Sequence, residues 1–384
     1  MNVPKLRFKE FNKEWKKEKF KQFSYYSGKR NKNNLSLIPY AITNINGFVP
    51  QNEAHNEFGY MKNTNREAYN IVTPKSFAYN PARINVGSIG YYNGTEDIIV
   101  SSLYEVFKTT DYIDDNFLWF WLKSNKLSIW INKLQEGSVR QYFYYDKLCE
   151  TPLYFPNINE QIKISKLLSL LDKKIELQTR KIEDLKLFKK GLIEFEFSNS
   201  NYNEINLKEI LKERKTYSEK GLEFPHVTLS KDGIYDKTGR YNRDFLVKSD
   251  DKKYKITYLN DLCYNPANLK FGVICLNEYG SAIFSPIYVT FVIKNIANPK
   301  YIKYYVTRNN FINAIRKYEQ GTVYERMAVA PEDFLKFSIK LPNIEIQNKF
   351  VAKLSKLDQK IELENLKLSR YIKLKKGLMQ NMFV

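Results

Sequence analysis

One stretch of the chain, residues 156–192, reads PNINEQIKISKLLSLLDKKIELQTRKIEDLKLFKKGL, and it returns 186 residues later, at 342–378, as PNIEIQNKFVAKLSKLDQKIELENLKLSRYIKLKKGL. Both copies open with Pro-Asn-Ile and close with Lys-Gly-Leu, and neither contains a proline in between. Apolar residues in each copy alternate at spacings of four and three, which is the heptad pattern of a coiled coil. The repeat therefore predicts two long helices, over 159–196 and 345–382.

Each predicted helix is about 38 residues, or roughly 57 Å at 1.5 Å per residue. Alone, each helix would expose its apolar seam to water, so we expect the two copies to pair antiparallel as an intramolecular coiled coil. The alternatives are packing of each helix on its own neighbouring domain, or association between chains. Polar residues interrupt the seam at Gln178 and Lys189, and again at Glu364 and Lys375. The expected seam residues are Ile164, Leu168, Leu171, Ile175, Ile182, Leu185, Phe350, Leu354, Leu357, Ile361 and Leu368.

Shorter repeats at nearly the same offset lie outside the helices. Tyr79-Asn80-Pro81-Ala82 returns as Tyr264-Asn265-Pro266-Ala267, and Gly137-Ser138-Val139 returns as Gly321-Thr322-Val323. The offset of about 185 residues far exceeds the period of solenoid repeats. The chain is therefore a duplicated module of a head followed by a helix.

The expected domains are a first head at 1–155, a first helical spacer at 156–198, a second head at 199–341 and a second spacer at 342–384. Short β-rich runs such as 97–108 and 285–294 are separated by Asn, Gly and Pro turns, while 115–134 and 299–318 read as helices. We therefore expect mixed α/β heads. The Asn- and Ser-rich segment 197–202 is the expected linker, and the glycines of the two Lys-Gly-Leu ends are expected to end or loosen the helices.

Composition favours a polyanionic partner. The formal net charge is +20, and the two helical stretches hold 18 Lys and Arg against 11 Asp and Glu, so most of the excess lies in the heads. The three cysteines match no metal-ligand spacing and leave one thiol unpaired in any disulfide scheme, which favours a reducing cytoplasm. No signal peptide is recognisable, and the longest apolar run, 117–122, is too short to span a bilayer.

Signals for catalysis are weak. The chain has two histidines and no His-Cys or His-carboxylate cluster at metal-ligand spacing, no phosphate-binding glycine loop and no nucleophile elbow. Asn80-Pro81-Ala82-Arg83 faintly resembles the catalytic loop of amino-methyltransferases but lacks its second proline and its stacking aromatic residue. A turn is the better interpretation, and we expect no metal and no cofactor.

Signals for DNA binding are stronger. The loop after Tyr79 combines a proline-fixed turn, an arginine and glycines that allow close approach of the backbone. Arg, Gln and Asn can contact guanine and adenine edges, while Ser and backbone amides suit phosphates. Each such residue taken singly also fits a solvated surface position. The candidate DNA-binding residues are Asn80, Arg83, Ser138, Arg140, Gln141, Lys231, Arg240, Arg243, Asn265, Asn268, Lys270, Thr322, Tyr324 and Arg326.

Together these features resemble the DNA specificity (S) subunits of type I restriction-modification systems. The resemblance rests on the duplicated layout and on the order Gly-Ser/Thr-Val, a β-like segment, an aromatic or Leu before Pro, Glu and Gln, then a long helix. The first copy has Gly137-Ser138-Val139, Phe155-Pro156 and Glu160-Gln161, whereas the second copy separates Glu345 from Gln347.

The resemblance implies a non-catalytic subunit with two α/β target-recognition domains, each binding one half of a split DNA site, joined by helices that set the gap. Two methyltransferase (modification) subunits would dock along those helices and bring S-adenosylmethionine, and restriction subunits would complete an ATP-dependent translocase and nuclease. A helix pair of roughly 57 Å would span at most roughly 16 base pairs. Two other hypotheses remain: an adaptor whose heads bind proteins, and an autonomous nuclease or methyltransferase.

Overall fold

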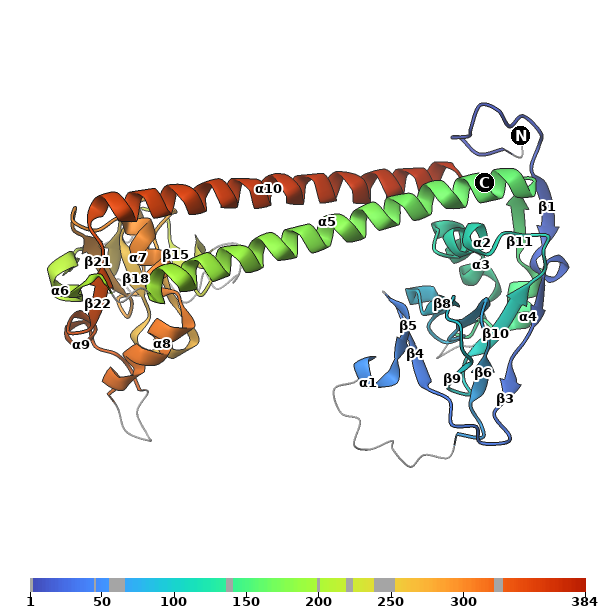
Figure 1. Cartoon of the computed structure of the whole chain (residues 1–384), viewed down its shortest axis with the longest axis horizontal. Coiled ribbons are helices and arrows are strands. Elements are labelled where there is room, and N and C mark those ends of the chain that lie inside the picture. The colour runs from blue at the N-terminus through green and yellow to red at the C-terminus, as the bar shows by residue number, and fades with distance from the viewer. Residues whose placement is uncertain are drawn as a thin grey trace. The chain divides into compact units, whose positions relative to one another are not determined.

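The computed structural model describes residues 3–44, 46–54, 66–135, 141–198, 201–218, 224–237, 253–320 and 327–384. The chain divides into two compact units, one of residues 1–180 and 366–384 and the other of residues 181–365 (Figure 1). Each unit contains one head and parts of both long helices. No helix in the described ranges is long and apolar enough to cross a membrane.

The two long helices are α5 (Ile158–Ser198) and α10 (Ile344–Asn381), whose ends lie within two residues of the predicted ranges. The expectation that Gly191 and Gly377 end or loosen the helices was wrong, because both helices continue through them. Side chains beyond each glycine pack on a head, Phe197 in one unit and Phe383 in the other. This packing outweighs the roughly 1 kcal/mol that a glycine costs inside a helix.

The two helices run antiparallel within each unit, and the polar interruptions of the seam help to fix their register. In the second unit the Lys189 ammonium lies 2.5 Å from the Asp358 carboxylate. In the first unit Lys375 forms the equivalent ion pair with Asp172. The 186-residue shift that relates the two copies turns one pair into the other, so the pairing follows the internal duplication.

The seam residues lie on the inner side of the helices. Those near the start of each helix, and Ile182 farther along α5, are buried, and the others are half-buried, because a two-helix contact covers only part of each side chain. The buried members are Ile164, Leu168, Leu171, Ile182, Phe350 and Leu354, and the half-buried members are Ile175, Leu185, Leu357, Ile361 and Leu368.

The first head contains a four-stranded antiparallel sheet in the order β2-β10-β7-β8, a five-stranded sheet in the order β3-β6-β9-β4-β5, and the pair β1-β11. The β4–β9 contact is parallel and the others are antiparallel. The elements are β1 (Lys16–Lys19), β2 (Ser24–Tyr26), β3 (Lys29–Arg30), β4 (Pro39–Thr43), β5 (Gly47–Pro50), α1 (Gln51–Ala54), β6 (Asn70–Val72), β7 (Ser76–Tyr79), β8 (Ile89–Tyr92), β9 (Ile98–Val100), β10 (Glu105–Thr109), α2 (Asp115–Leu122), α3 (Asn125–Leu134), α4 (Tyr145–Glu150) and β11 (Pro152–Phe155).

The second head repeats the four-stranded sheet in the order β13-β21-β18-β19 and adds the sheet β14-β17-β20 and the pairs β15-β16 and β12-β22. The predicted α/β fold class is confirmed in both heads. The elements are β12 (Asn203–Asn206), α6 (Leu207–Ile210), β13 (Leu211–Glu213), β14 (Tyr217–Ser218), β15 (Val227–Ser230), β16 (Gly233–Asp236), β17 (Tyr254–Thr257), β18 (Leu262–Tyr264), β19 (Ile274–Leu276), β20 (Ala282–Phe284), β21 (Val289–Ile293), α7 (Pro299–Val306), α8 (Asn309–Ile315), α9 (Pro331–Leu335) and β22 (Ser338–Leu341).

Each head helix that the sequence predicted as one element is broken into two. In the first head α2 ends at Leu122 and α3 begins at Asn125, because the Ser124 hydroxyl donates to the Trp121 carbonyl and accepts from the Lys126 amide. Such local bonds compete with the helical ladder. In the second head α7 and α8 are separated at Thr307–Arg308.

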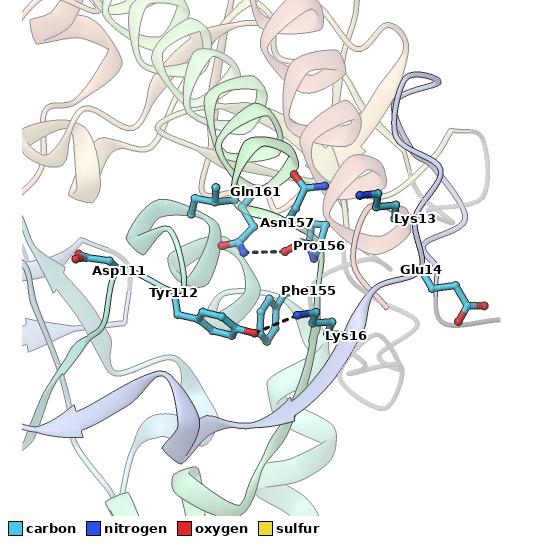
Figure 2. A pocket seen from close by; sticks show the side chains of 10 residues that line it. Lys13, Glu14, Lys16, Asp111, Tyr112, Phe155, Pro156, Asn157 and Gln161 are labelled. Carbon is cyan, nitrogen blue, oxygen red and sulfur yellow. Dashed lines mark hydrogen bonds between the residues drawn. The ribbon is translucent and has the colours of Figure 1, made fainter.

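A buried glutamine ties the start of each long helix to its head. The Gln161 amide donates to the Pro156 carbonyl at 2.9 Å, and its oxygen accepts the Asp114 amide N–H, at the N-terminus of α2. Figure 2 shows Gln161 and Pro156 beside a pocket of about 340 Å³, which Lys16 and Tyr112 also line. Gln347 repeats this arrangement at the start of α10, with bonds to the Pro342 carbonyl and the Asn298 amide. The Gln of the repeated motif is therefore a structural anchor.

The predicted linker at 197–202 begins too early. Phe197 belongs to α5, and its ring lies 5.0 Å from the ring centroids of both Tyr301 and Tyr305. The apolar contact that holds this segment helical comes from the second head and is not visible in the local composition.

Candidate nucleic-acid interface

The repeated Tyr-Asn-Pro-Ala motif lies at one end of the four-stranded sheet of each head. In the first head Tyr79, the last residue of β7, is opposite Glu105 of β10 and Ile89 of β8. The strands are antiparallel, so the loop 80–88 and the turn 101–104 emerge at the same end. We call this the loop end of the sheet. In the second head Tyr264 is opposite Val289 and Ile274, which makes loop 265–273 and turn 285–288 its loop end.

The loop 80–88 is a tight, internally bonded turn. The Asn80 Oδ1 accepts the Ala82 amide N–H at 3.0 Å, and the Asn80 carbonyl accepts the Arg83 amide at 2.9 Å. Gly87 has φ of +92°, a conformation that favours glycine. The oxygen of Asn80 is therefore used to hold the turn, while the Arg83 side chain is exposed and forms no ion pair with a described residue.

A second segment, residues 141–144, is hydrogen-bonded to this loop. The Phe143 amide donates to the Pro81 carbonyl at 3.0 Å, which brings the exposed Gln141 beside the loop. The rings of Tyr142 and Tyr144 stack with centroids 5.4 Å apart and planes 3° from parallel. Together these segments form a cleft of about 880 Å³, lined by Asn80, Pro81, Ala82, Arg83, Asn85, Ser102, Leu103, Glu105, Gln141, Tyr142 and Tyr144.

Glu105 puts a negative group into this cleft. Its side chain is half-buried and forms no hydrogen bond with a described residue. Burial raises the pKa of Glu105 above its usual range, and the Asp146 carboxylate adds to this shift while Arg30 opposes it. Tyr79, on the adjacent strand, is fully buried with its hydroxyl unpaired among the described residues, and burial raises its pKa as well. Tyr79 is therefore a core residue and not a ligand-binding one.

The second head repeats the backbone geometry of the loop end. The Asn265 Oδ1 accepts the Ala267 amide at 3.1 Å, Gly272 has φ of +79°, and the Val329 amide donates to the Pro266 carbonyl at 3.3 Å. Lys231, at the turn between β15 and β16, lies over Gly272. Tyr264 is buried like its counterpart, but its hydroxyl donates to the Val329 carbonyl at 3.0 Å.

The polar side chains at the two loop ends differ although the backbone repeats. Arg83 and Asn85 of the first head correspond to Asn268 and Lys270 of the second, by their places in the two loops. Glu105 corresponds to the buried, apolar Val289. The loop ends of the two heads thus have the same backbone hydrogen bonds but carry different polar side chains.

The structure brings several of the predicted DNA-binding residues together. Asn80, Arg83 and Gln141 line one cleft, and Asn265, Asn268 and Lys270 share one loop with Lys231 against it. The sequence did not single out Asn85, although it lies in the same loop as Arg83. It also missed Ser102, Leu103 and Glu105, because only strand pairing places them at the cleft. The remaining candidates lie outside the described residues: Ser138, Arg140, Arg240, Arg243, Thr322, Tyr324 and Arg326.

The comparisons with known proteins agree with this architecture. Residues 5–187 match the family model described as the type I restriction modification DNA specificity domain. No curated protein sequence matches the chain significantly.

Three solved structures share the fold over nearly the whole chain. The HsdS subunit from Thermoanaerobacter tengcongensis has a TM-score of 0.52 at 13% identity, covering 96% of each chain. The S subunit of a type I restriction-modification system from M. genitalium has a TM-score of 0.54 at 14% identity, covering 100% of this chain and 99% of that one. A structure described in terms of complex assembly and conformational transition of the type I R-M system has a TM-score of 0.59 at 12% identity, covering 95% of this chain and 96% of that chain. Residues 5–187 therefore belong to the type I restriction modification DNA specificity domain family, and the chain shares the fold of these solved S-subunit structures over nearly its whole length.

Proposed function

We propose that this chain is the sequence-specific DNA-binding subunit of a type I restriction-modification complex, and that each head reads one half of a bipartite target. The observation that carries the proposal is the repeated loop end, which has the same backbone bonds in both heads and different side chains on them. A shared frame would present both heads to duplex DNA in the same way. Different side chains would make the two half-sites differ in sequence.

The exposed Arg83 and Lys270 and the half-buried Asn268 suit base edges and phosphates. Arginine makes bidentate contacts with guanine, and asparagine with adenine, while lysine attracts phosphates. Arg83 in the first head and Asn268 in the second stand at corresponding positions, so they are the first candidates for base contacts. The net charge of +20 supports the sequence-independent part of DNA binding.

The long helices are proposed to dock two methyltransferase subunits, with restriction subunits completing the complex. Large apolar side chains remain exposed on both helices, for example Leu170, Leu187 and Phe188 on α5 and Leu363 on α10. Exposed apolar surface of this kind marks protein interfaces. Under this proposal S-adenosylmethionine belongs to the methyltransferase subunit, the chain itself is non-catalytic, and it acts in the cytoplasm.

The proposal is tested by a binding selection from random duplexes at controlled salt, using the chain co-expressed with its methyltransferase subunit. Enrichment of a split motif with a fixed gap supports it and yields both half-sites. A stable protein complex that enriches no sequence would contradict it and favour an adaptor whose heads bind proteins. Methyl transfer or DNA cleavage by the purified chain alone would instead support an autonomous enzyme.

Arg83→Ala is expected to weaken binding to one half-site by about 1–3 kcal/mol, the usual worth of a bidentate base contact. Base preference at the contacted position should relax, while the other half-site keeps its selectivity. Asn268→Ala is the matched variant in the second head and should affect the other half-site. Competition titrations with duplexes substituted in one half-site measure both effects, and a uniform loss over all sequences would show that Arg83 contacts only phosphate.

Inserting one heptad into both α5 and α10 is expected to lengthen the preferred gap between the half-sites. Seven residues add roughly 10 Å of helix while preserving the apolar seam, which corresponds to about three base pairs. The binding selection repeated on the insertion variant measures the new gap. An unchanged gap, with the complex still assembled, would exclude the helices as the spacing device.

A further inference from the structure

Bulky apolar side chains stand exposed at the loop end of both heads. In the first head Leu103 is 71% exposed and Val86 is 54% exposed. In the second head Ile287 is 62% exposed and Phe271 is 64% exposed. Among described residues outside the two long helices, Leu103, Phe271 and Ile287 are the most exposed large apolar side chains.

Leu103 and Ile287 occupy equivalent positions in the fold. Each is the third residue of a four-residue turn that leads into the strand next to the Tyr-Asn-Pro-Ala motif. In the first head the Tyr104 amide closes the turn on the Ser101 carbonyl at 3.1 Å, and in the second head Tyr288 closes it on Ser285 at the same distance.

Val86 and Phe271 are also equivalent. Each directly precedes the left-handed glycine that ends the loop, and each glycine amide donates to the carbonyl three residues before it, at 2.9 Å for Gly87 and 2.8 Å for Gly272. Apolar exposure therefore recurs at two positions of the loop end, in both copies.

Scattered exposed apolar residues are normal on protein surfaces and need no special cause. Here, however, the polar positions around them have diverged, since Arg83 is replaced by Asn268 and Glu105 by Val289. A side chain that stays bulky, aliphatic and exposed while its neighbours change is best explained by a contact common to both heads. In the first head Leu103 lines the same cleft as Arg83 and Gln141. A contact made by Leu103 would therefore lie beside the side chains proposed to contact bases.

We propose that Leu103 and Ile287 contact the 5-methyl groups of thymines, one within each half-site. The inference rests on the proposed DNA-reading function and names the base that each turn recognises. The thymine methyl is the one apolar group that a base pair displays in the major groove, and an aliphatic side chain releases water when it packs against it. Val86 and Phe271 flank the contact at the same end of the sheet.

The test uses the complex of the full chain with its methyltransferase subunit and the duplex obtained by selection. Each thymine of the half-sites is replaced in turn by deoxyuridine, which keeps the base pair and removes only the methyl group. The proteins compared are the unmodified chain, Leu103→Ser, Ile287→Ser and Leu259→Ser. Leu259 is the matched control, because it is a large aliphatic residue that is 59% exposed in the turn before β18, at the opposite end of that strand from Asn265.

One uracil substitution in a half-site is expected to weaken binding by the unmodified chain about fourfold, since burying a methyl-sized group is worth roughly 0.8 kcal/mol. Leu103→Ser should bind the complete site about fourfold or more weakly and lose the uracil effect in one half-site only. Ile287→Ser should do the same in the other half-site, and Leu259→Ser should behave like the unmodified chain.

Two results would overturn the inference: selected half-sites without thymine, or serine variants that keep both their affinity and their sensitivity to uracil. Either result leaves the DNA-reading function intact. Failure of that function is recognised separately, because the unmodified complex would then select no split motif at all.

Discussion

Phe383→Ala is expected to lower the free energy of unfolding of the first unit by about 3–5 kcal/mol, the usual cost of emptying a buried phenylalanine site. Phe383 is buried in the core of the first head, with its ring 5.2 Å from that of Phe117. The segment just before it is also tied down, since the Leu6 amide donates to the Asn381 carbonyl at 2.9 Å. The end of α10 therefore acts as part of the first head's core.

Urea denaturation followed by hydrogen exchange measures this loss and assigns it to the first unit. Leu374→Ala is the control on the same helix, because Leu374 is exposed and its removal should change stability by less than about 0.5 kcal/mol. Amides of the second unit should keep their protection in both variants. Equal protection of the first head in Phe383→Ala and Leu374→Ala would contradict the structural role of Phe383.

Arg7→Ala is expected to destabilise the first unit by about 3–5 kcal/mol, because it leaves a carboxylate buried without its partner. The Glu160 side chain is inaccessible to solvent, and the Arg7 guanidinium donates to its two oxygens at 2.7 and 2.8 Å. Trp15 adds only a long contact, with its Nε1 3.4 Å from the carboxylate. The pair joins the N-terminal segment to the first turn of α5.

The double variant Arg7→Met with Glu160→Leu should recover most of the loss, since an apolar pair of similar volume replaces two desolvated charges. Thermal or urea unfolding of the single and double variants measures this recovery. The hydrogen bond to Glu160 raises the pKa of Arg7 above its usual value, so the stability that this shift contributes is present below the usual value and is lost as the pH rises through the raised value. A double variant as unstable as Arg7→Ala would show that the charges themselves are needed.

The long helices and the duplicated plan were predictable from the sequence because heptad spacing and motif repeats are local or nearly periodic signals. The ends of α5 and α10 fell within two residues of the predicted ranges for that reason. The breaks inside the head helices were missed because they depend on single hydroxyl bonds such as that of Ser124. The linker was misplaced because Phe197 is held in the helix by aromatic rings more than 100 residues away in sequence.

The candidate site was predictable in part. Asn80 and Arg83 were predicted because they belong to a repeated proline turn. The Asn80 Oδ1, however, accepts a hydrogen bond from the Ala82 amide within that turn. Glu105 and Leu103 carry no local signal. They reach the cleft because β10 pairs with β7, which places residues more than 20 positions apart at one end of a sheet.

The sequence by itself therefore determined that two similar heads alternate with two long helices, since apolar periodicity and repeated motifs need no tertiary information. Only the tertiary structure decided which side chains lie together at the loop end of each head. It also decided that the seam residues Lys189 and Lys375 form ion pairs, Lys189 with Asp358 and Lys375 with Asp172. It also decided that the ends of both helices belong to the cores of the heads. The physical reason is that strand pairing and core packing join residues distant in sequence, whereas helix formation is governed by neighbours three and four residues apart.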